Sequence, residues 1–236
     1  LLYLEEQTRL RLEQENTPIE PGVLFTPPAA SAYDGVEFLE FAVDEAVGAR
    51  LGSWLKRLGF AEAGKHRSKD VQLLRQGDIN IVLNAEPYSF GHNFFEAHGP
   101  SLCATALRVK DPQAALKRAT AFRGQPFRGL VGPNECEVPA VRAPDGSLLY
   151  LVEQGTAGHT LYDTDFSLDK SATATGGLRR IDHMALALPA ESLDSWVLFY
   201  KSLFDFAADD EVVLPDPYGL VKSRALRSQC GTLRLP

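Results

Sequence analysis

One histidine in an apolar run is the residue of this sequence best suited to chemistry. His183 lies within residues 181–189, which alternate apolar and polar side chains at the start and then become fully apolar. That pattern predicts a strand that enters a hydrophobic core. An imidazole placed there is a candidate ligand for a divalent metal ion. The alternative is a core histidine that hydrogen-bonds to a backbone carbonyl, and the residue by itself fits both.

The elements that would position His183 follow a repeated pattern of a strand, a helix and two strands. The pattern predicts strands at residues 36–43, 71–75, 79–83, 104–109, 138–142 and 148–152, and helices at residues 50–58, 88–97, 111–121 and 195–206. Asp111 is placed to cap the third of these helices, with Pro112 at its first position. This order of elements predicts an α+β fold.

The pattern restarts after the glycine pair at residues 176–177. Residues 36–38 align with residues 181–183, and Phe60 follows the first of these runs at almost the same interval as Phe206 follows the second. An internal repeat of this kind indicates two copies of one structural module.

The repeat also predicts how the chain is divided. We expect a complete first module at residues 35–155, a connector at 156–177 and the first half of a second module at 178–236. Because half a module leaves a sheet edge open, we expect the natural protein to continue. Residues 1–34 are expected to be the helical tail of an upstream domain followed by a proline-rich linker. A terminal helix docked onto the first module is the alternative.

Composition restricts the class of protein. The 236 residues are 44% hydrophobic and 23% charged, with a formal net charge of −7, as expected for a globular protein with a sizeable core. Basic residues do not cluster, which argues against a nucleic-acid partner. No apolar run approaches the length of a membrane span, so no membrane partner is expected. The three cysteines are odd in number and are spaced neither for a zinc site nor for a disulfide framework, which predicts a reducing, cytoplasmic location.

Several longer motifs resemble those of bacterial 4-hydroxyphenylpyruvate dioxygenases, which are members of the vicinal-oxygen-chelate superfamily. They are RSKDV at residues 67–71, RQGDIN at 75–80, GPSLC at 99–103, GSLLYLV at 146–152 and YDTDF at 162–166. The resemblance implies tandem βαβββ vicinal-oxygen-chelate modules with curved mixed sheets, the second being incomplete in this chain. It also implies a metal held by two histidines and one carboxylate, a set that suits non-haem iron because it leaves positions open.

The resemblance assigns roles to single residues. His183 matches the first metal ligand, and the other two ligands are expected beyond Pro236. Ser223 and Pro236 match positions that line the substrate pocket of the family. In the first module the corresponding ligand positions hold Phe38, Cys103 or Ala104, and Tyr150. These are poor ligands for a hard divalent ion, so we expect Phe38 and Tyr150 to point into a concavity that has no metal.

The leader before the first module favours one function. It resembles the arrangement of a bacterial fusion in which a barrel acting as 3-dehydroshikimate dehydratase precedes a dioxygenase-like region. That resemblance implies a lyase that converts 3-dehydroshikimate to protocatechuate and water in quinate and shikimate breakdown, using Mg²⁺, Mn²⁺ or Co²⁺. Catalysis would then lie in the upstream barrel, and this part alone is expected to be inactive.

Two other functions are left open. One is a dioxygenase that uses Fe²⁺ and O₂ to convert 4-hydroxyphenylpyruvate to homogentisate. The other is a non-catalytic binding or dimerisation module, because modules of this superfamily can keep the fold without the site. The expected partner is a small aromatic or hydroaromatic acid, and homo-oligomer formation is left open.

Overall fold

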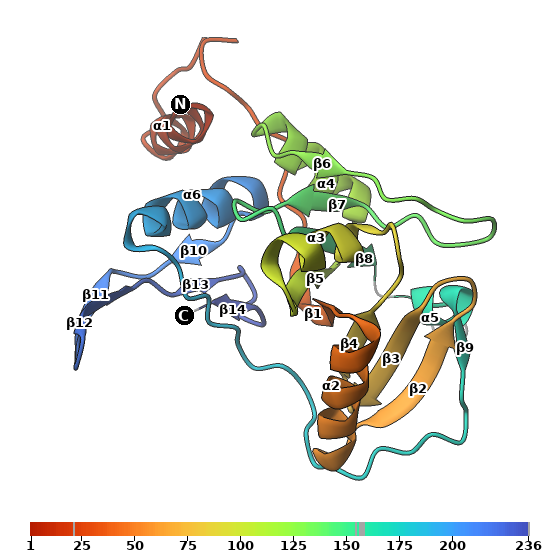
Figure 1. Cartoon of the computed structure of the whole chain (residues 1–236). Coiled ribbons are helices and arrows are strands. Elements are labelled where there is room, and N and C mark those ends of the chain that lie inside the picture. The colour runs from red at the N-terminus through yellow and green to blue at the C-terminus, as the bar shows by residue number, and fades with distance from the viewer. Residues whose placement is uncertain (21, 154, 156–158, 236) are drawn as a thin grey trace.

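A nine-stranded mixed sheet forms the centre of the computed structural model, which describes residues 1–20, 22–153, 155 and 159–235 (Figure 1). Its spatial order is β6-β7-β8-β5-β1-β4-β3-β2-β9. The strands are β1 (Tyr33–Ala42), β2 (Ala61–His66), β3 (Val71–Gln76), β4 (Ile79–Asn84), β5 (Ser101–Val109), β6 (Pro126–Phe127), β7 (Ala140–Arg142), β8 (Leu148–Glu153) and β9 (Phe166–Leu168).

The sheet consists of two similar halves that meet at the antiparallel pair of β1 and β5. Within the first half β1 is parallel to β4, and β4 and β3 form a hairpin. Within the second half β5 is parallel to β8, and β8 pairs antiparallel with β7. Each half thus has the order βαβββ. The expected α+β fold with mixed sheets is confirmed.

Helix starts in this region are set by capping side chains. The Asp44 carboxylate accepts from the Val47 N–H at 2.7 Å where α2 (Glu45–Arg57) begins. Asp111 accepts from the Ala114 N–H at 2.9 Å, and α4 (Pro112–Ala121) begins with proline, as the sequence predicts. Two shorter helices, α3 (Phe90–His98) and α5 (Leu161–Asp165), follow β4 and precede β9.

Alternation along β1 separates two environments. Leu39 and Phe41 pack with the core under α2, together with Leu74 and Ile81. Phe38, the residue before Leu39, packs in a different cluster on the opposite face of the sheet. Successive strand residues point to opposite faces, so one strand serves both the α2 core and the opposite face.

The leader is docked on the sheet's helices. Glu6 on α1 (Leu2–Gln14) is buried and accepts from Arg118 Nη2 on α4 at 3.0 Å. Arg118 Nη1 also donates to the Pro28 carbonyl at 2.9 Å, and Phe25 packs its ring edgewise on Phe122. These contacts show that α1 is docked on the rest of the chain, which is the alternative to a free helical tail and linker. The upstream domain stays a prediction.

The last part of the chain adds a long helix and small strands. A 3₁₀ turn (Ala190–Ser192) leads into α6 (Leu193–Phe204), and β10 (Ala207–Ala208), β13 (Leu226–Arg227) and β14 (Arg234–Leu235) form a three-stranded sheet. The hairpin of β11 (Val212–Asp216) and β12 (Gly219–Ser223) projects from this body (Figure 1). Phe204 and Phe206 contact Tyr33 edge-to-face, with ring centroids 5.8 and 5.7 Å apart.

The strand expected at residues 181–189 is wrong. This run has no regular secondary structure, and its described backbone contact with a neighbouring strand is the bond from the Met184 N–H to the Arg234 carbonyl at 3.1 Å. A strand needs a ladder of such bonds along its length. The apolar pattern instead comes from Ile181, Met184 and Leu188, which pack against the main core.

No helix that the structure describes is both long and apolar enough to pass through a bilayer.

We predict that Glu6→Gln destabilises the protein by about 3 kcal/mol, because it leaves the buried Arg118 guanidinium without its counter-charge. The Glu6 and Arg118 side chains are only 7% and 3% exposed. Glu137→Gln is the matched control, since Glu137 faces Arg128 at 3.8 Å with both side chains exposed; this variant should change stability by less than about 1 kcal/mol. Urea denaturation measures both, and equal effects would contradict the docking.

Candidate functional site

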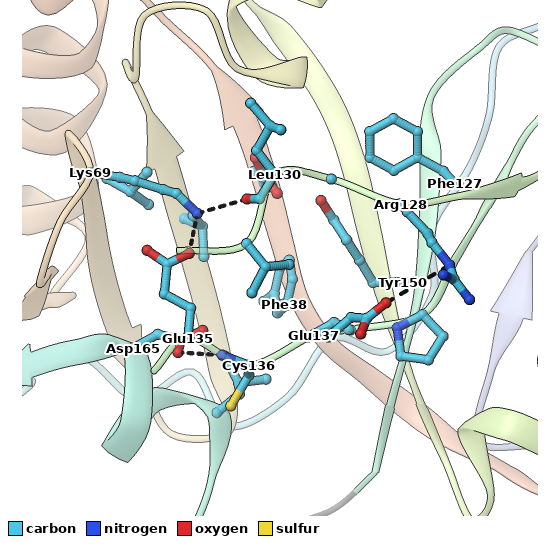
Figure 2. A pocket seen from close by; sticks show the side chains of 18 of the residues that line it. Phe38, Lys69, Phe127, Arg128, Leu130, Glu135, Cys136, Glu137, Tyr150 and Asp165 are labelled. Atoms are coloured by element: carbon cyan, nitrogen blue, oxygen red, sulfur yellow. Dashed lines mark hydrogen bonds and ion pairs between the residues drawn. The ribbon is translucent and has the colours of Figure 1, made fainter. Parts of the chain in front are cut away.

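A cavity of about 530 Å³ lies against the sheet face opposite α2. Its sheet wall comes from Phe38 on β1, Val71 on β3, Val82 on β4 and Tyr150 on β8. The rings of Phe38 and Tyr150 are 5.7 Å apart, and both lie beside the hollow in Figure 2. The expectation that these two residues point into the concavity of the first module is confirmed.

The segment that leads from β6 towards β7 covers the cavity, and we call residues 128–138 the cover loop. Figure 2 shows Lys69 reaching across to this loop, where its Nζ donates to Glu135 at 2.6 Å and to the Leu130 carbonyl at 3.3 Å. Glu135 also accepts from the Ser68 hydroxyl and from the Gly132 N–H. These bonds hold the loop closed over the sheet.

Charge at the cover loop is strongly stabilised. Burial favours the neutral form of Glu135, but hydrogen bonds from Lys69, Ser68 and Gly132 outweigh it and lower the pKa of the carboxyl to about 2. Beside it the Cys136 N–H donates to Asp165 Oδ1 at 2.8 Å, which fixes the far end of the loop (Figure 2).

The floor of the cavity has the opposite electrostatics. Glu40 is 8% exposed, and its Oε1 accepts from Asn84 Nδ2 at 2.7 Å. Burial raises the pKa of Glu40, and the hydrogen bonds from Asn84 and Cys103 offset only part of that effect. Burial, with the nearby Glu40 and Cys103, raises the pKa of the Tyr150 phenol as well. The floor therefore favours a neutral carboxyl group next to a neutral phenol.

The sequence carried a signal for Glu40 that its interpretation missed. Phe38 and Glu40 are two apart on one strand, so they share a face. A carboxylate on the core-facing side of a strand is unusual unless it has a partner. That partner, Asn84, is 44 residues away, and only the parallel pairing of β1 with β4 brings the two together.

His183 lies outside this cavity. Its imidazole is 55% exposed, and its Nδ1 lies 2.9 Å from Asp182 Oδ2. The hydrogen bond to His183 lowers the pKa of Asp182, and Asp182 also pairs with Arg234. A carboxylate can only accept, so this contact places the proton on Nδ1 and leaves Nε2 to bind a ligand.

Ser223 is found at a different place from His183. It ends β12 and lines a hollow of about 310 Å³ between α6 and residues 185–188, and His183 is not among the residues that line it. Pro236 lies outside the described residues. Within the part of the chain that the structure describes, no three His, Cys, Asp or Glu side chains come together as a metal site. His183 and its described neighbours therefore do not form a complete set of three metal ligands.

Comparison with known proteins agrees with this fold. The family described as hydroxyphenylpyruvate dioxygenase, HPPD, N-terminal, matches residues 26–167, which is more than half of the chain. The chain belongs to this family. Its members among curated proteins include the 4-hydroxyphenylpyruvate dioxygenase of Pseudomonas sp. (strain P.J. 874), which is 36% identical over 206 residues, covering 86% of this chain and 57% of that protein.

Two longer relatives of this dioxygenase-family chain carry another name. The 3-dehydroshikimate dehydratases of Pseudomonas putida and Pseudomonas aeruginosa are 97% and 71% identical to it over 236 residues. The chain spans only 37% of the length of each.

Solved structures give the same result. A protein described as a xylose isomerase-like TIM barrel/4-hydroxyphenylpyruvate dioxygenase fusion superposes with a TM-score of 0.90 at 95% identity, over the whole chain and 37% of the fusion. A mutant of 4-hydroxymandelate synthase from Streptomyces coelicolor superposes with a TM-score of 0.71 at 20% identity, over 89% of this chain and 62% of that protein, and supports the fold alone. The chain corresponds to the C-terminal, dioxygenase-like part of such fusions.

We predict opposite pH responses for the two glutamates of the cavity. Glu40 has a folded-state pKa above its ordinary value of 4.5, so its contribution to stability is present below about pH 4.5 and is lost as the pH rises. Glu40→Gln should therefore gain stability relative to the native protein as the pH rises above about 4.5.

Glu135 has the reverse sign because its folded-state pKa is about 2. Its contribution is present above about pH 4.5 and is lost as the pH falls towards the folded value. Glu135→Gln should therefore be most destabilising at neutral pH and nearly neutral in strong acid. Urea denaturation across this range measures both variants, and parallel pH trends would show that the two environments are not distinct.

Proposed function

We propose that the chain is the dioxygenase-like part of a lyase that removes water from 3-dehydroshikimate to give protocatechuate, as a step in quinate and shikimate breakdown. The observation that carries the proposal is 97% identity, over the whole chain, to a protein named 3-dehydroshikimate dehydratase. The structural match to a barrel/dioxygenase fusion at 95% identity supports it.

We assign the dehydration to the part of the relatives that lies outside this chain. Relatives of which the chain spans 37% carry the dehydratase name. Relatives of which it spans 57% or 58% include those named 4-hydroxyphenylpyruvate dioxygenase. The dehydratase name therefore accompanies additional length, which in the fusion structure includes a TIM barrel. Mg²⁺, Mn²⁺ or Co²⁺ is the metal we expect in that part.

We assign His183 as one ligand of a divalent metal in the second module. The Asp182 contact at 2.9 Å supports this role, because a carboxylate on one imidazole nitrogen fixes the tautomer and directs the other nitrogen to the metal. A bound metal would supply a Lewis acid for an oxygen of the substrate. We assign Ser223 and Pro236 to the substrate pocket of that module. Because the described residues form no complete ligand set, no reaction step is derived for this site.

A second candidate function is oxygen-dependent conversion of 4-hydroxyphenylpyruvate to homogentisate with Fe²⁺. The observation that favours it is 36% identity to 4-hydroxyphenylpyruvate dioxygenases over 86% of the chain. Both functions use a small aromatic or hydroaromatic acid, and they differ in whether oxygen is consumed.

We predict that His183→Ala in the full-length protein lowers bound metal by about one equivalent per chain, because the site that we propose loses one of its three expected ligands. Elemental analysis of the purified protein measures this. The variant should still dehydrate 3-dehydroshikimate, which the absorbance of the product protocatechuate measures.

His98→Ala is the matched control, since His98 is exposed at the end of α3 and packs on Phe94. It should change neither metal content nor dehydration. If the native protein takes up oxygen with 4-hydroxyphenylpyruvate and His183→Ala does not, the second function is favoured. Unchanged metal content in His183→Ala would show that His183 is not a ligand, and loss of dehydration would contradict its assignment to the other part of the protein.

A further inference from the structure

The cavity of the first module has the make-up of a small-molecule site. Its volume of about 530 Å³ lies in the range of ligand pockets. Four aromatic rings line it, those of Phe38, Phe127, Tyr150 and Phe166. Such sites combine mostly apolar walls with a few converging polar groups, and here the polar groups meet at the floor.

The floor holds polar groups that the fold does not need. Glu40 lines the cavity while buried, and Asn84 is its described hydrogen-bond partner at 2.7 Å. No described residue hydrogen-bonds the Tyr150 hydroxyl. Burying the Glu40 carboxyl is unfavourable, and an apolar side chain at its place would pack against the same walls. Buried polar groups that converge in a cavity are typical of a binding site.

Charge at the cavity selects the class of ligand. The burial that raises the pKa of Glu40 is unfavourable for an anion at the floor as well. The same burial is unfavourable for a cation at the floor, because any charge there would be taken out of water. A neutral hydroxyl satisfies both conditions, because it can donate to and accept from the carboxyl and the phenol.

We propose that the first-module cavity binds a small neutral hydroxylated aromatic molecule, with its ring against Phe38 and Tyr150 and its hydroxyl at Glu40 and Tyr150. Aromatic rings favour offset or edge contacts with other rings, and the side chains of Phe38 and Tyr150 already meet in a tilted arrangement. The cover loop closes the site from the other side through Lys69 and Glu135 (Figure 2).

This site is separate from the proposed function. His183, Asp182 and Arg234 do not line the cavity, and Ser223 lines another hollow. Dehydration of 3-dehydroshikimate could fail in an assay while the cavity still binds its ligand, and the reverse also holds. The two proposals therefore fail independently.

The test is calorimetric titration of the full-length protein with four ring-sized probes: phenol, toluene, benzoate and benzylamine. Phenol should bind most tightly, at least about fivefold more tightly than toluene, which lacks the hydroxyl. Tyr150→Phe keeps the ring and removes one hydrogen-bonding group, so it should weaken phenol binding about fivefold while leaving toluene binding unchanged.

Tyr162→Phe is the matched control, because Tyr162 is a buried tyrosine of the same half of the chain whose hydroxyl donates to the Glu37 carbonyl, and it does not line the cavity. It should leave phenol binding unchanged, and circular dichroism should show both variants folded. Equal phenol binding by Tyr150→Phe and the native protein would overturn the proposal. Tighter binding of toluene, benzoate or benzylamine than of phenol, or no binding of any probe, would also overturn it.

Discussion

The antiparallel pairing of β1 with β5 is the constraint on which the rest of the structure depends. It joins the two βαβββ halves into one sheet, with Phe38 opposite Ala106 and Glu40 opposite Ala104. Small partners at both places leave room in front of the strand, where the cavity opens. Leu39 and Phe41, which alternate with Phe38 and Glu40 along β1, face the α2 core. A single pair of strands therefore fixes both the packing of the module and the position of its polar floor.

The same sheet produces two opposite electrostatic environments about one cavity. At the floor, burial dominates and raises the pKa of Glu40. At the cover loop, three donors dominate and lower the pKa of Glu135 to about 2. Whether a buried carboxyl is neutral or charged depends on how many donors reach it. Glu135 on the closed cover loop therefore stays ionised, and burial at the floor favours the neutral form of Glu40.

Local signals in the sequence were sufficient for much of the fold. Asp111 and Pro112 start α4 because capping and proline geometry act within one helical turn. The resemblance to the dioxygenase family placed Phe38 and Tyr150 correctly in the concavity. By contrast, β2 has the sequence AEAGKH, which lacks a clear apolar alternation and contains a register shift, so its strand forms only because β3 and β9 flank it.

The features that the sequence did not reveal depend on distant partners. Residues 181–189 have the pattern of a strand, but a strand also needs neighbours for its backbone, and here the apolar residues fill a core instead. The pairing of Glu6 with Arg118 and that of Glu40 with Asn84 join residues 112 and 44 positions apart. Such pairs follow from topology, which a pattern within a short window does not contain.

The central claim is that the two parts of the chain differ in chemistry: a cavity for neutral organic molecules in the first module and a metal ligand at His183 in the second. Anomalous X-ray diffraction from crystals of the full-length protein, collected at the absorption edge of its metal, tests this most directly. The account predicts a peak within bonding distance of His183 Nε2 and no peak among Glu40, Cys103 and Tyr150. A peak in the first-module cavity, or a metal-loaded protein with none at His183, would contradict it.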